Sequence, residues 1–160
     1  MRKLRCRLRS CRGFTLVETM AAAAVLALLA LMLHTGLLMA QRSYVNMTGA
    51  AERQLLLSTL GDLLSNELRY ARDVVAEPGG RLERYTSVNY GRNTILSLSD
   101  GQLAANGLRM LSTGAYGNGA YTLDTCAITY DSGTFQVALE VSGWGGSDSA
   151  QFSVRCLNPT

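Results

Sequence analysis

The chain has 160 residues, of which 48% are apolar and 17% are charged, so its composition is that of a folded protein and not of a disordered one. This length suits one compact domain with an appendage better than two full domains. A single histidine, two prolines and one tryptophan leave little material for a conventional active site.

Positive charge is concentrated at the N-terminus. From Phe14 onward nine basic side chains are outnumbered by twelve acidic ones. A basic arm for nucleic acid is one interpretation of this asymmetry. An apolar segment follows at once, however, and this favours a membrane-orienting leader. Six cations and no acid lie in the first twelve residues: Arg2, Lys3, Arg5, Arg7, Arg9 and Arg12.

The apolar segment runs from Met20 to Ala40 without a formal charge. As a helix it spans about 31 Å, close to the thickness of a bilayer core. The alanines at 21–24 and the leucines that follow favour helix over strand. Because the cations precede this segment, we expect the N-terminus in the cytoplasm and the rest of the chain outside.

A cleaved secretory signal has the same basic start and apolar centre. Such a signal needs small side chains just before its cut, whereas Leu38 is large at that place in Leu38-Met39-Ala40. A lipoprotein signal needs a cysteine after the apolar run, and Cys6 and Cys11 precede it. The segment is therefore predicted to stay in the protein.

Residues 41–76 change from uniformly apolar to amphipathic. Arg53 and other charged residues are assigned to the faces away from the apolar stripe. The sequence Glu-Pro-Gly-Gly at 77–80 is typical of a helix end. We therefore predict one helix from about Thr15 to Ala76. Its outer stripe recurs at three- and four-residue intervals at Leu56, Leu60, Leu63, Leu64, Leu68, Ala71 and Val75.

Residues 77–160 have the pattern of strands. The Asp-Ser-Gly at 131–133 predicts a tight hairpin between 121–130 and 134–142, and the composition of 143–149 indicates a loop. Trp144 in this loop is assigned to covering an edge of the head, with a contact role as the alternative. The fold class is α+β: a long N-terminal helix packed on an antiparallel sheet of four to six strands. Strands are expected within 84–90, 93–99, 121–130, 134–143 and 150–157, with 107–112 as a further candidate.

Nothing in the head predicts catalysis, a cofactor or a metal. The lone His34 makes neither a metal site nor a catalytic triad, and the aspartates lack the spacing of a calcium-binding loop. We therefore predict that the chain is not an enzyme. Acids are interleaved with the head arginines, so a mixed solvated surface is favoured over a nucleic-acid patch. These arginines are Arg69, Arg72, Arg81, Arg84, Arg92 and Arg109.

The sequence RGFTLVE, Arg12 to Glu18, resembles the processing site of the type IV pilin superfamily, which includes pilins and the pseudopilins of secretion and competence systems. The resemblance rests on four coinciding features: a short basic leader, a glycine, an apolar start with a glutamate, and a long uncharged helix. It implies that a prepilin peptidase cuts between Gly13 and Phe14 and methylates the new amine of Phe14.

The same resemblance implies an assembly role for Glu18, which becomes the fifth residue of the mature chain. In that superfamily the glutamate is thought to pair with the N-terminal amine of a neighbouring subunit. Ionisable groups in a membrane usually pair and usually mark function. The alternative is an interfacial Glu18 without a partner.

Cys126 and Cys156 fall in predicted strands outside the membrane, where an oxidising environment permits a disulfide. Many pilins tie their C-terminal region in this way, so the resemblance implies a Cys126–Cys156 bond. Two unpaired buried thiols are the alternative. Cys6 and Cys11 belong to the predicted leader and are assigned no role.

The predicted organisation is a cleaved leader (1–13), a transmembrane and assembly half of the helix (14–40), an amphipathic half (41–76) and a β-rich head (77–160). The predicted function is that of a minor pilin or pseudopilin in a type IV pilus-like filament. Its expected partners are the prepilin peptidase, other pilin or pseudopilin subunits and a cytoplasmic-membrane assembly platform. The expected location is first the cytoplasmic membrane and then an extracellular or periplasmic filament. A membrane-anchored binding protein that never polymerises and a competence pseudopilin in DNA uptake are the alternatives.

Overall fold

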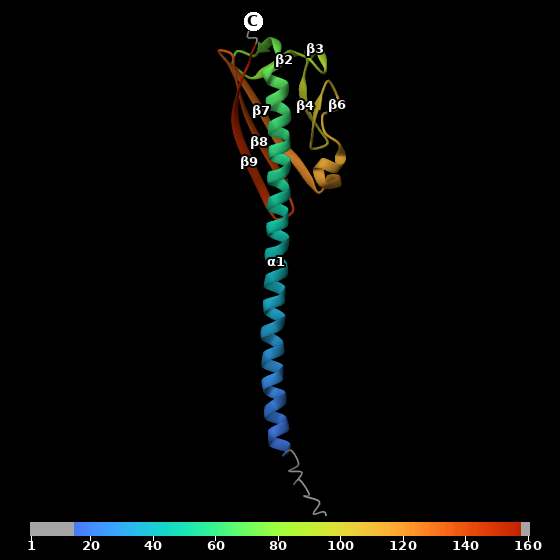
Figure 1. Cartoon of the computed structure of the whole chain (residues 1–160), viewed down its shortest axis with the longest axis vertical. Coiled ribbons are helices and arrows are strands. Elements are labelled where there is room, and N and C mark those ends of the chain that lie inside the picture. Colours follow the sequence, from blue (N-terminus) through green and yellow to red (C-terminus); the bar gives the residue numbers. More distant parts are fainter. Residues whose placement is uncertain (1–14, 158–160) are drawn as a thin grey trace, which may run out of the picture. The chain divides into compact units, whose positions relative to one another are not determined.

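The computed structural model describes residues 15–157 (Figure 1). The chain divides into two units, Met1–Arg42 and Ser43–Thr160, and each is described by itself. Helix α1 (Leu16–Arg69) supplies residues to both. The nine strands that follow it are all in the second unit and pair antiparallel, so the predicted α+β class is confirmed.

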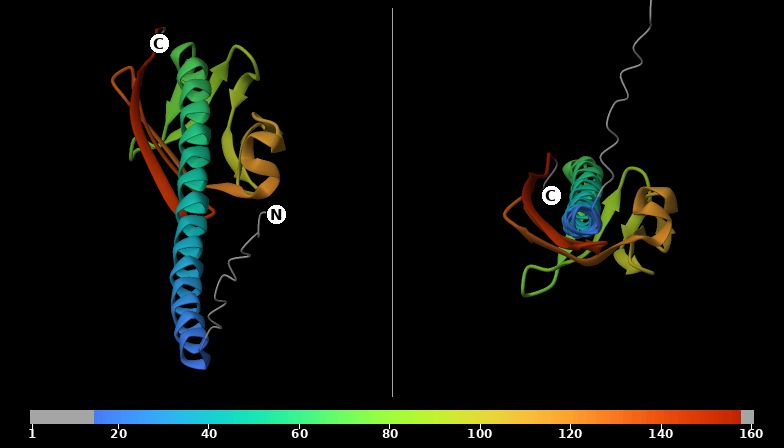
Figure 2. Two further views of the ribbon diagram at one scale, coloured as in Figure 1. Left: turned by 60° about the horizontal axis from the view of Figure 1, so that its bottom comes forward. Right: turned by 90° about the horizontal axis from the view of Figure 1, so that it is seen from below.

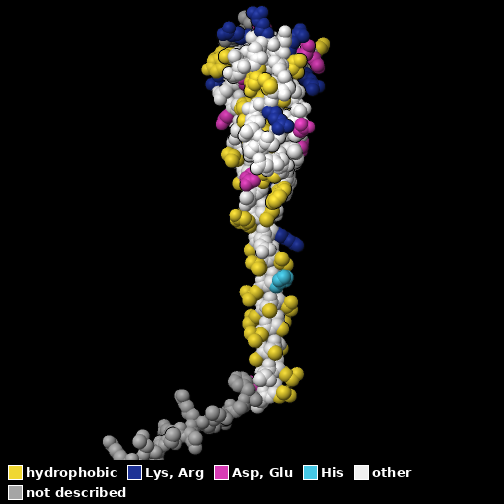
Figure 3. Space-filling view, turned by 90° about the vertical axis from the view of Figure 1, so that its right-hand side faces the viewer, with side chains coloured by type: hydrophobic (Ala, Val, Ile, Leu, Met, Phe, Trp, Pro, Cys, Tyr) yellow, Lys and Arg dark blue, Asp and Glu magenta, His cyan; other side chains and the backbone are white. Residues whose placement is uncertain are grey.

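In the first unit the described residues belong almost entirely to α1. Its side chains are exposed throughout, including those of Leu16, Met32 and Met39. Among the described residues, α1 is the one helix long and apolar enough to cross a membrane, judged by length and composition. On the face shown in Figure 3, the exposed side chains of its apolar part are mostly hydrophobic.

The second unit contains three small sheets, not the single sheet of four to six strands that the sequence predicted. The predicted strand 93–99 is interrupted, because the Ile95 N–H donates to the Asn106 side chain (2.9 Å) between two short strands. The sheets are β1 (Arg72–Ala76), β2 (Leu82–Ser87) and β3 (Gly91–Thr94); β4 (Leu96–Ser99), β5 (Gln102–Ala105) and β6 (Leu108–Arg109); and β7 (Tyr121–Asp131), β8 (Thr134–Gly143) and β9 (Gly146–Arg155). A 3₁₀ segment, η1 (Thr113–Gly119), precedes β7.

The core of the second unit forms where these sheets curve around the outer part of α1 (Figure 2). The predicted helical stripe is buried from Leu56 to Leu68, with Leu63 only partly covered. Strand β8 alternates, so that every second side chain faces this stripe and is almost inaccessible to water. These β8 side chains are Phe135, Val137, Leu139 and Val141.

Two hairpins join the longest strands. The predicted tight turn at 131–133 is confirmed, but Asp131 pairs with Thr134, so only Ser132 and Gly133 form the turn; both have positive φ, 47° and 84°, as a two-residue turn requires. The prediction of a loop at 143–149 was wrong for most of its length. Gly143 pairs with Gly146, so the turn contains only Trp144 and Gly145, and β9 begins directly afterwards.

The predicted end of α1 at Ala76 was also wrong: the helix ends at Arg69, and β1 begins at Arg72. The C-terminal segment caps the helix, because the Leu157 N–H donates to the Arg69 carbonyl (2.9 Å) and the Cys156 thiol to the Ala71 carbonyl (3.1 Å). Residues 77–80 therefore form the turn between β1 and β2 and do not terminate the helix.

Candidate functional site

The N-terminal turn of α1 is the first part of the candidate site that the structure describes. Thr15 lies at the cap position, and its Oγ1 accepts a hydrogen bond from the Glu18 N–H (3.3 Å). Thr15 and Glu18 have the spacing of a capping box, in which a carboxylate in the first turn also meets the positive end of the helix dipole. Gly13 and Phe14, the predicted cleavage residues, lie outside the described residues.

Glu18 has no ion-pair partner in the part of the chain that the structure describes. Its side chain is exposed, and no residue from Thr19 to Gln41 carries a formal charge. The next cation along the chain is Arg42, which in a helix is about 36 Å away. Within the described residues, Thr15 caps the backbone N–H of Glu18, whereas the Glu18 carboxylate has no compensating charge.

The apolar side chains of α1 in the first unit form an extended surface that no other residue in the described part of the chain covers. Such a surface is far larger than a soluble monomer normally exposes. It is satisfied by lipid or by the apolar faces of other helices. Its largest members are Leu16, Val17, Met20, Val25, Leu26, Leu28, Leu29, Leu31, Met32, Leu33, Leu37, Leu38 and Met39.

In the second unit, Arg53 was predicted to lie on a face away from the apolar stripe, and this was wrong. The Arg53 side chain is 6% exposed; its Nε donates to the Asp148 carboxylate at 2.7 Å and its Nη1 donates to the Trp144 carbonyl. The helical spacing could have indicated this burial, because Arg53 continues the apolar stripe of Leu57, Leu60 and Leu64 by one step toward the N-terminus.

Glu67 is a second buried charge on the same stripe, and sequence reasoning missed it. Its carboxylate accepts hydrogen bonds from Tyr85 (3.3 Å), from Ser87, and from the Asn89 side chain (2.9 Å). The described residues supply no cation to it, so these donors compensate its burial. Burial and the adjacent Glu67 together raise the pKa of Tyr85 above its ordinary range. The cluster thus fixes the first sheet to α1.

The predicted Cys126–Cys156 disulfide is not formed, because both thiols are free in the structure. Cys126 pairs with Leu139 on β8, whereas the Cys156 N–H donates to the carbonyl of Gly133, which lies in the turn before β8 and six residues before Leu139. At the rise of a strand this separates the two cysteines by about 20 Å, and a disulfide needs Cα atoms within about 7 Å.

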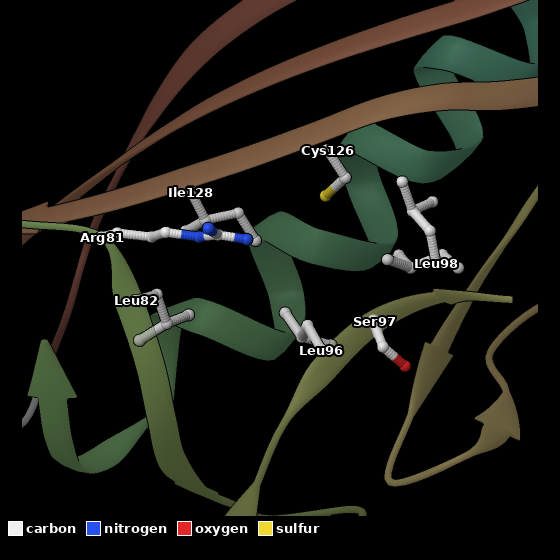
Figure 4. A pocket seen from close by; sticks show the side chains of 8 residues that line it. Arg81, Leu82, Leu96, Ser97, Leu98, Cys126 and Ile128 are labelled. Atoms are coloured by element: carbon white, nitrogen blue, oxygen red, sulfur yellow. The ribbon is translucent and has the colours of Figure 1, made fainter. Parts of the chain in front are cut away.

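The Cys126 thiol is directed into a hollow of about 310 Å³ between β7 and β4 (Figure 4). Aliphatic side chains line most of this space, with Arg81 and Ser97 as its other polar members. Burial raises the pKa of Cys126 from 9.0 to about 11, so the thiol is protonated at neutral pH. A protonated thiol is a poor nucleophile, and the hollow therefore lacks a reactive cysteine.

The remaining predicted residues are dispersed. His34 lies on the exposed apolar part of α1, and no group of three metal-ligating side chains occurs among the described residues. Two of the six head arginines pair with acids at the surface: Arg84 with Glu83 (3.4 Å) and Arg109 with Asp100 (3.6 Å). This is the mixed pattern of a solvated surface.

Comparison with known proteins supports the N-terminal part of the candidate site. The family model described as the prokaryotic N-terminal methylation motif matches residues 8–33. This is the prepilin-type signal of type IV pilins and pseudopilins, and it contains Gly13, Phe14 and Glu18. Neither the curated proteins nor the solved structures contain a match to the chain.

Proposed function

The chain carries the prepilin-type N-terminal methylation motif of type IV pilins and pseudopilins, and from this premise we propose that it is a minor pilin or pseudopilin. In this proposal it is a structural subunit of a type IV pilus-like filament. The subunit is stored in the cytoplasmic membrane through the apolar part of α1 and is then assembled through the same surface. The head, residues 77–160, forms the outside of the filament.

The observation that carries the proposal is the combination of an uncompensated Glu18 with an uncovered apolar helix surface. Packing α1 against copies of itself or related subunits removes that surface from lipid without exposing it to water. Cleavage between Gly13 and Phe14 creates an amine that can compensate Glu18 of a neighbouring subunit. Because an unpaired charge in an apolar environment is costly, this contact favours one axial offset between subunits.

In this proposal the chain has three partners, which act in succession. A prepilin peptidase removes residues 1–13 and methylates Phe14. The six cations of this leader hold the N-terminus in the cytoplasm until then, and their removal releases it. An assembly platform in the cytoplasmic membrane then transfers the subunit into the filament, where other pilin or pseudopilin subunits cover α1.

Two substitutions separate the assembly role of Glu18 from its role in helix capping. Glu18→Gln keeps a side chain that suits the third position of a capping box but removes the charge. Thr15→Ala removes the cap acceptor and keeps the charge, at a cost of about 0.5–2 kcal/mol in helix stability. If the carboxylate pairs with a neighbouring amine, Glu18→Gln abolishes incorporation into filaments and Thr15→Ala retains it.

The measurement is the fraction of subunit recovered in sheared filaments, with the membrane level of each variant as the control. Equal incorporation of Glu18→Gln and the unchanged protein would overturn the charge-pairing role. The mass of the mature N-terminus, after co-expression with a prepilin peptidase, tests the processing step. A chain beginning at Phe14 with one methyl group is expected, and an uncut chain would leave a membrane-anchored protein that does not polymerise.

A further inference from the structure

An exposed aromatic cluster occurs at the beginning of the second unit. Tyr44, Val45 and Trp144, here called the aromatic patch, are 71%, 45% and 66% exposed. Tyr44 and Val45 lie on α1, and Trp144 lies in the turn between β8 and β9. The three residues line one hollow of about 240 Å³, whose wall is mostly apolar. The fold thus brings together large side chains from distant parts of the chain and leaves them uncovered.

The turn that carries Trp144 is firmly seated on α1. Arg53 donates to the Trp144 carbonyl, and a Cβ atom on Gly49 would lie 2.5 Å from that carbonyl oxygen, so only glycine permits the approach. A Cβ on Gly145 would lie 3.3 Å from the Asn46 side-chain oxygen. The backbone of the turn is therefore fixed while the indole remains exposed, which is typical of a binding surface.

The position of the patch in the chain indicates what covers it. Tyr44 is the fourth residue after Ala40, where the uncharged segment ends, and four residues of helix extend about 6 Å. The polar layer on each side of a bilayer is about 5–8 Å thick. Tyrosine and tryptophan are enriched in this layer, because their rings are apolar and their O–H or N–H groups remain hydrated.

We propose that the aromatic patch is a membrane-interface anchor, which rests in the headgroup layer of the leaflet from which the apolar segment emerges. This inference rests on the membrane-stored stage of the proposed function. The patch holds the head against the bilayer before assembly, and it must leave the lipid when the subunit enters a filament.

The charges around the patch predict how it binds lipid. Glu52 is the one charged residue that lines the hollow, and its carboxylate raises the pKa of Tyr121 beside it. Arg53 is engaged by Asp148. A carboxylate gains nothing from anionic lipids, so insertion depends on the apolar and aromatic side chains. We expect the patch to insert into zwitterionic phosphatidylcholine without anionic lipid, and added phosphatidylglycerol to act only through Arg42, two residues before Tyr44.

Trp144 is the only tryptophan in the chain, so its fluorescence reports directly on the patch. The full chain is reconstituted into phosphatidylcholine vesicles brominated either near the headgroup or deep in the acyl chain. We expect the emission of Trp144 to shift to shorter wavelength relative to urea-unfolded chain. We also expect stronger quenching by the shallow bromine than by the deep one.

A matched control moves the reporter away from the patch. In the double variant Trp144→Phe, Leu108→Trp, the new indole replaces a side chain that is 64% exposed on β6 and lies outside the hollow. Its emission is expected to remain at long wavelength and unquenched by either lipid. If this control were quenched as strongly as Trp144, lipid would cover the head without preference and the anchor would be refuted.

Other outcomes also decide the question. A Trp144 that neither bromine quenches overturns the inference. Emission that shifts with the protein-to-lipid ratio but not with bromine position assigns the patch to a neighbouring copy, and this too overturns it. The N-terminal mass of chain co-expressed with prepilin peptidase is measured on the same preparation. An uncut chain with quenched Trp144 refutes the pilin-like function alone, and a cut chain with unquenched Trp144 refutes the anchor alone.

Discussion

The guanidinium of Arg53 and the carboxylate of Asp148 lie 2.7 Å apart, although 95 positions separate the two residues in the chain. Arg53 is 6% exposed, and Asp148 is 33% exposed. This pair and the Trp144 carbonyl fasten the last hairpin to α1 at one end of the apolar stripe. The Glu67 cluster fastens the first sheet near the other end.

Replacing Asp148 and replacing Arg53 are predicted to lower the free energy of unfolding by different amounts. Asp148→Asn leaves a buried cation with neutral acceptors and no compensating charge, and we expect a loss of about 2–3 kcal/mol in the free energy of unfolding. Arg53→Met leaves the partly exposed Asp148, which water can solvate, and should cost about 1 kcal/mol less. Calorimetry of the full chain in detergent measures both. Equal losses would contradict the asymmetry, and the double variant should resemble Arg53→Met alone.

Two helical glycines provide a matched pair of substitutions. Gly49→Ala places a Cβ atom 2.5 Å from the Trp144 carbonyl oxygen, so it should displace the turn and cost about 1–3 kcal/mol. Gly61→Ala places its Cβ atom 3.6 Å from the Phe152 ring, an ordinary contact, and should stabilise by up to about 1 kcal/mol. Thermal unfolding of the two variants should therefore shift in opposite directions. If Gly49→Ala left the unfolding temperature unchanged or raised it, the turn would not depend on Gly49.

Stability is predicted to fall at alkaline pH. The pKa of Cys126 is raised by burial from 9.0 to about 11, and that of Tyr85 is raised from 10.0 by burial and Glu67. The folded state binds the protons of Cys126 and Tyr85 more tightly than the unfolded state does. Each protonated group therefore contributes fully to the free energy of unfolding below its unfolded pKa, and this contribution is lost as pH rises toward the folded pKa. Cys126→Ala should remove the part of the decline that begins near pH 9, and the tyrosine part from pH 10 should remain. An unchanged pH profile of the free energy of unfolding would assign the decline to other groups.

The two head cysteines are predicted to be free thiols. In a chain with Cys6→Ser and Cys11→Ser, a maleimide should modify both remaining cysteines after unfolding without reductant. In the folded protein Cys156, which is 3% exposed, should react far more slowly than it does in the unfolded chain. Mass spectrometry counts the adducts. If unfolded protein failed to react until a reductant was added, the cysteines would be bonded and the register of β7 to β9 would have to differ.

Several elements could be predicted because their signals are local. The two-residue turn at Ser132 and Gly133 follows from residues that tolerate positive φ, and β8 follows from strict alternation. The apolar stripe from Leu56 to Leu68 follows from helical spacing. In each case the pattern lies within one short run of consecutive residues.

Other elements could not be predicted, because their causes lie far away in the chain. Arg53 and Glu67 occupy stripe positions, yet what permits their burial is Asp148 for the one and Tyr85, Ser87 and Asn89 for the other. The absence of a disulfide follows from a strand register that neither cysteine specifies.

The sequence by itself determined the methylation motif at residues 8–33 and the uncharged segment that ends at Ala40. Both are defined by contiguous residues: the motif by its order of side chains, and the membrane segment by its length and hydrophobicity. Tertiary structure decided where α1 ends: the segment Cys156–Leu157 bonds to the carbonyls of Arg69 and Ala71, and β1 then pairs with β2. It also decided that Trp144 and Tyr44 line the same hollow beside Gly49. Such contacts depend on which backbone and side-chain groups the folded chain brings together as partners. Local sequence preference does not contain that information.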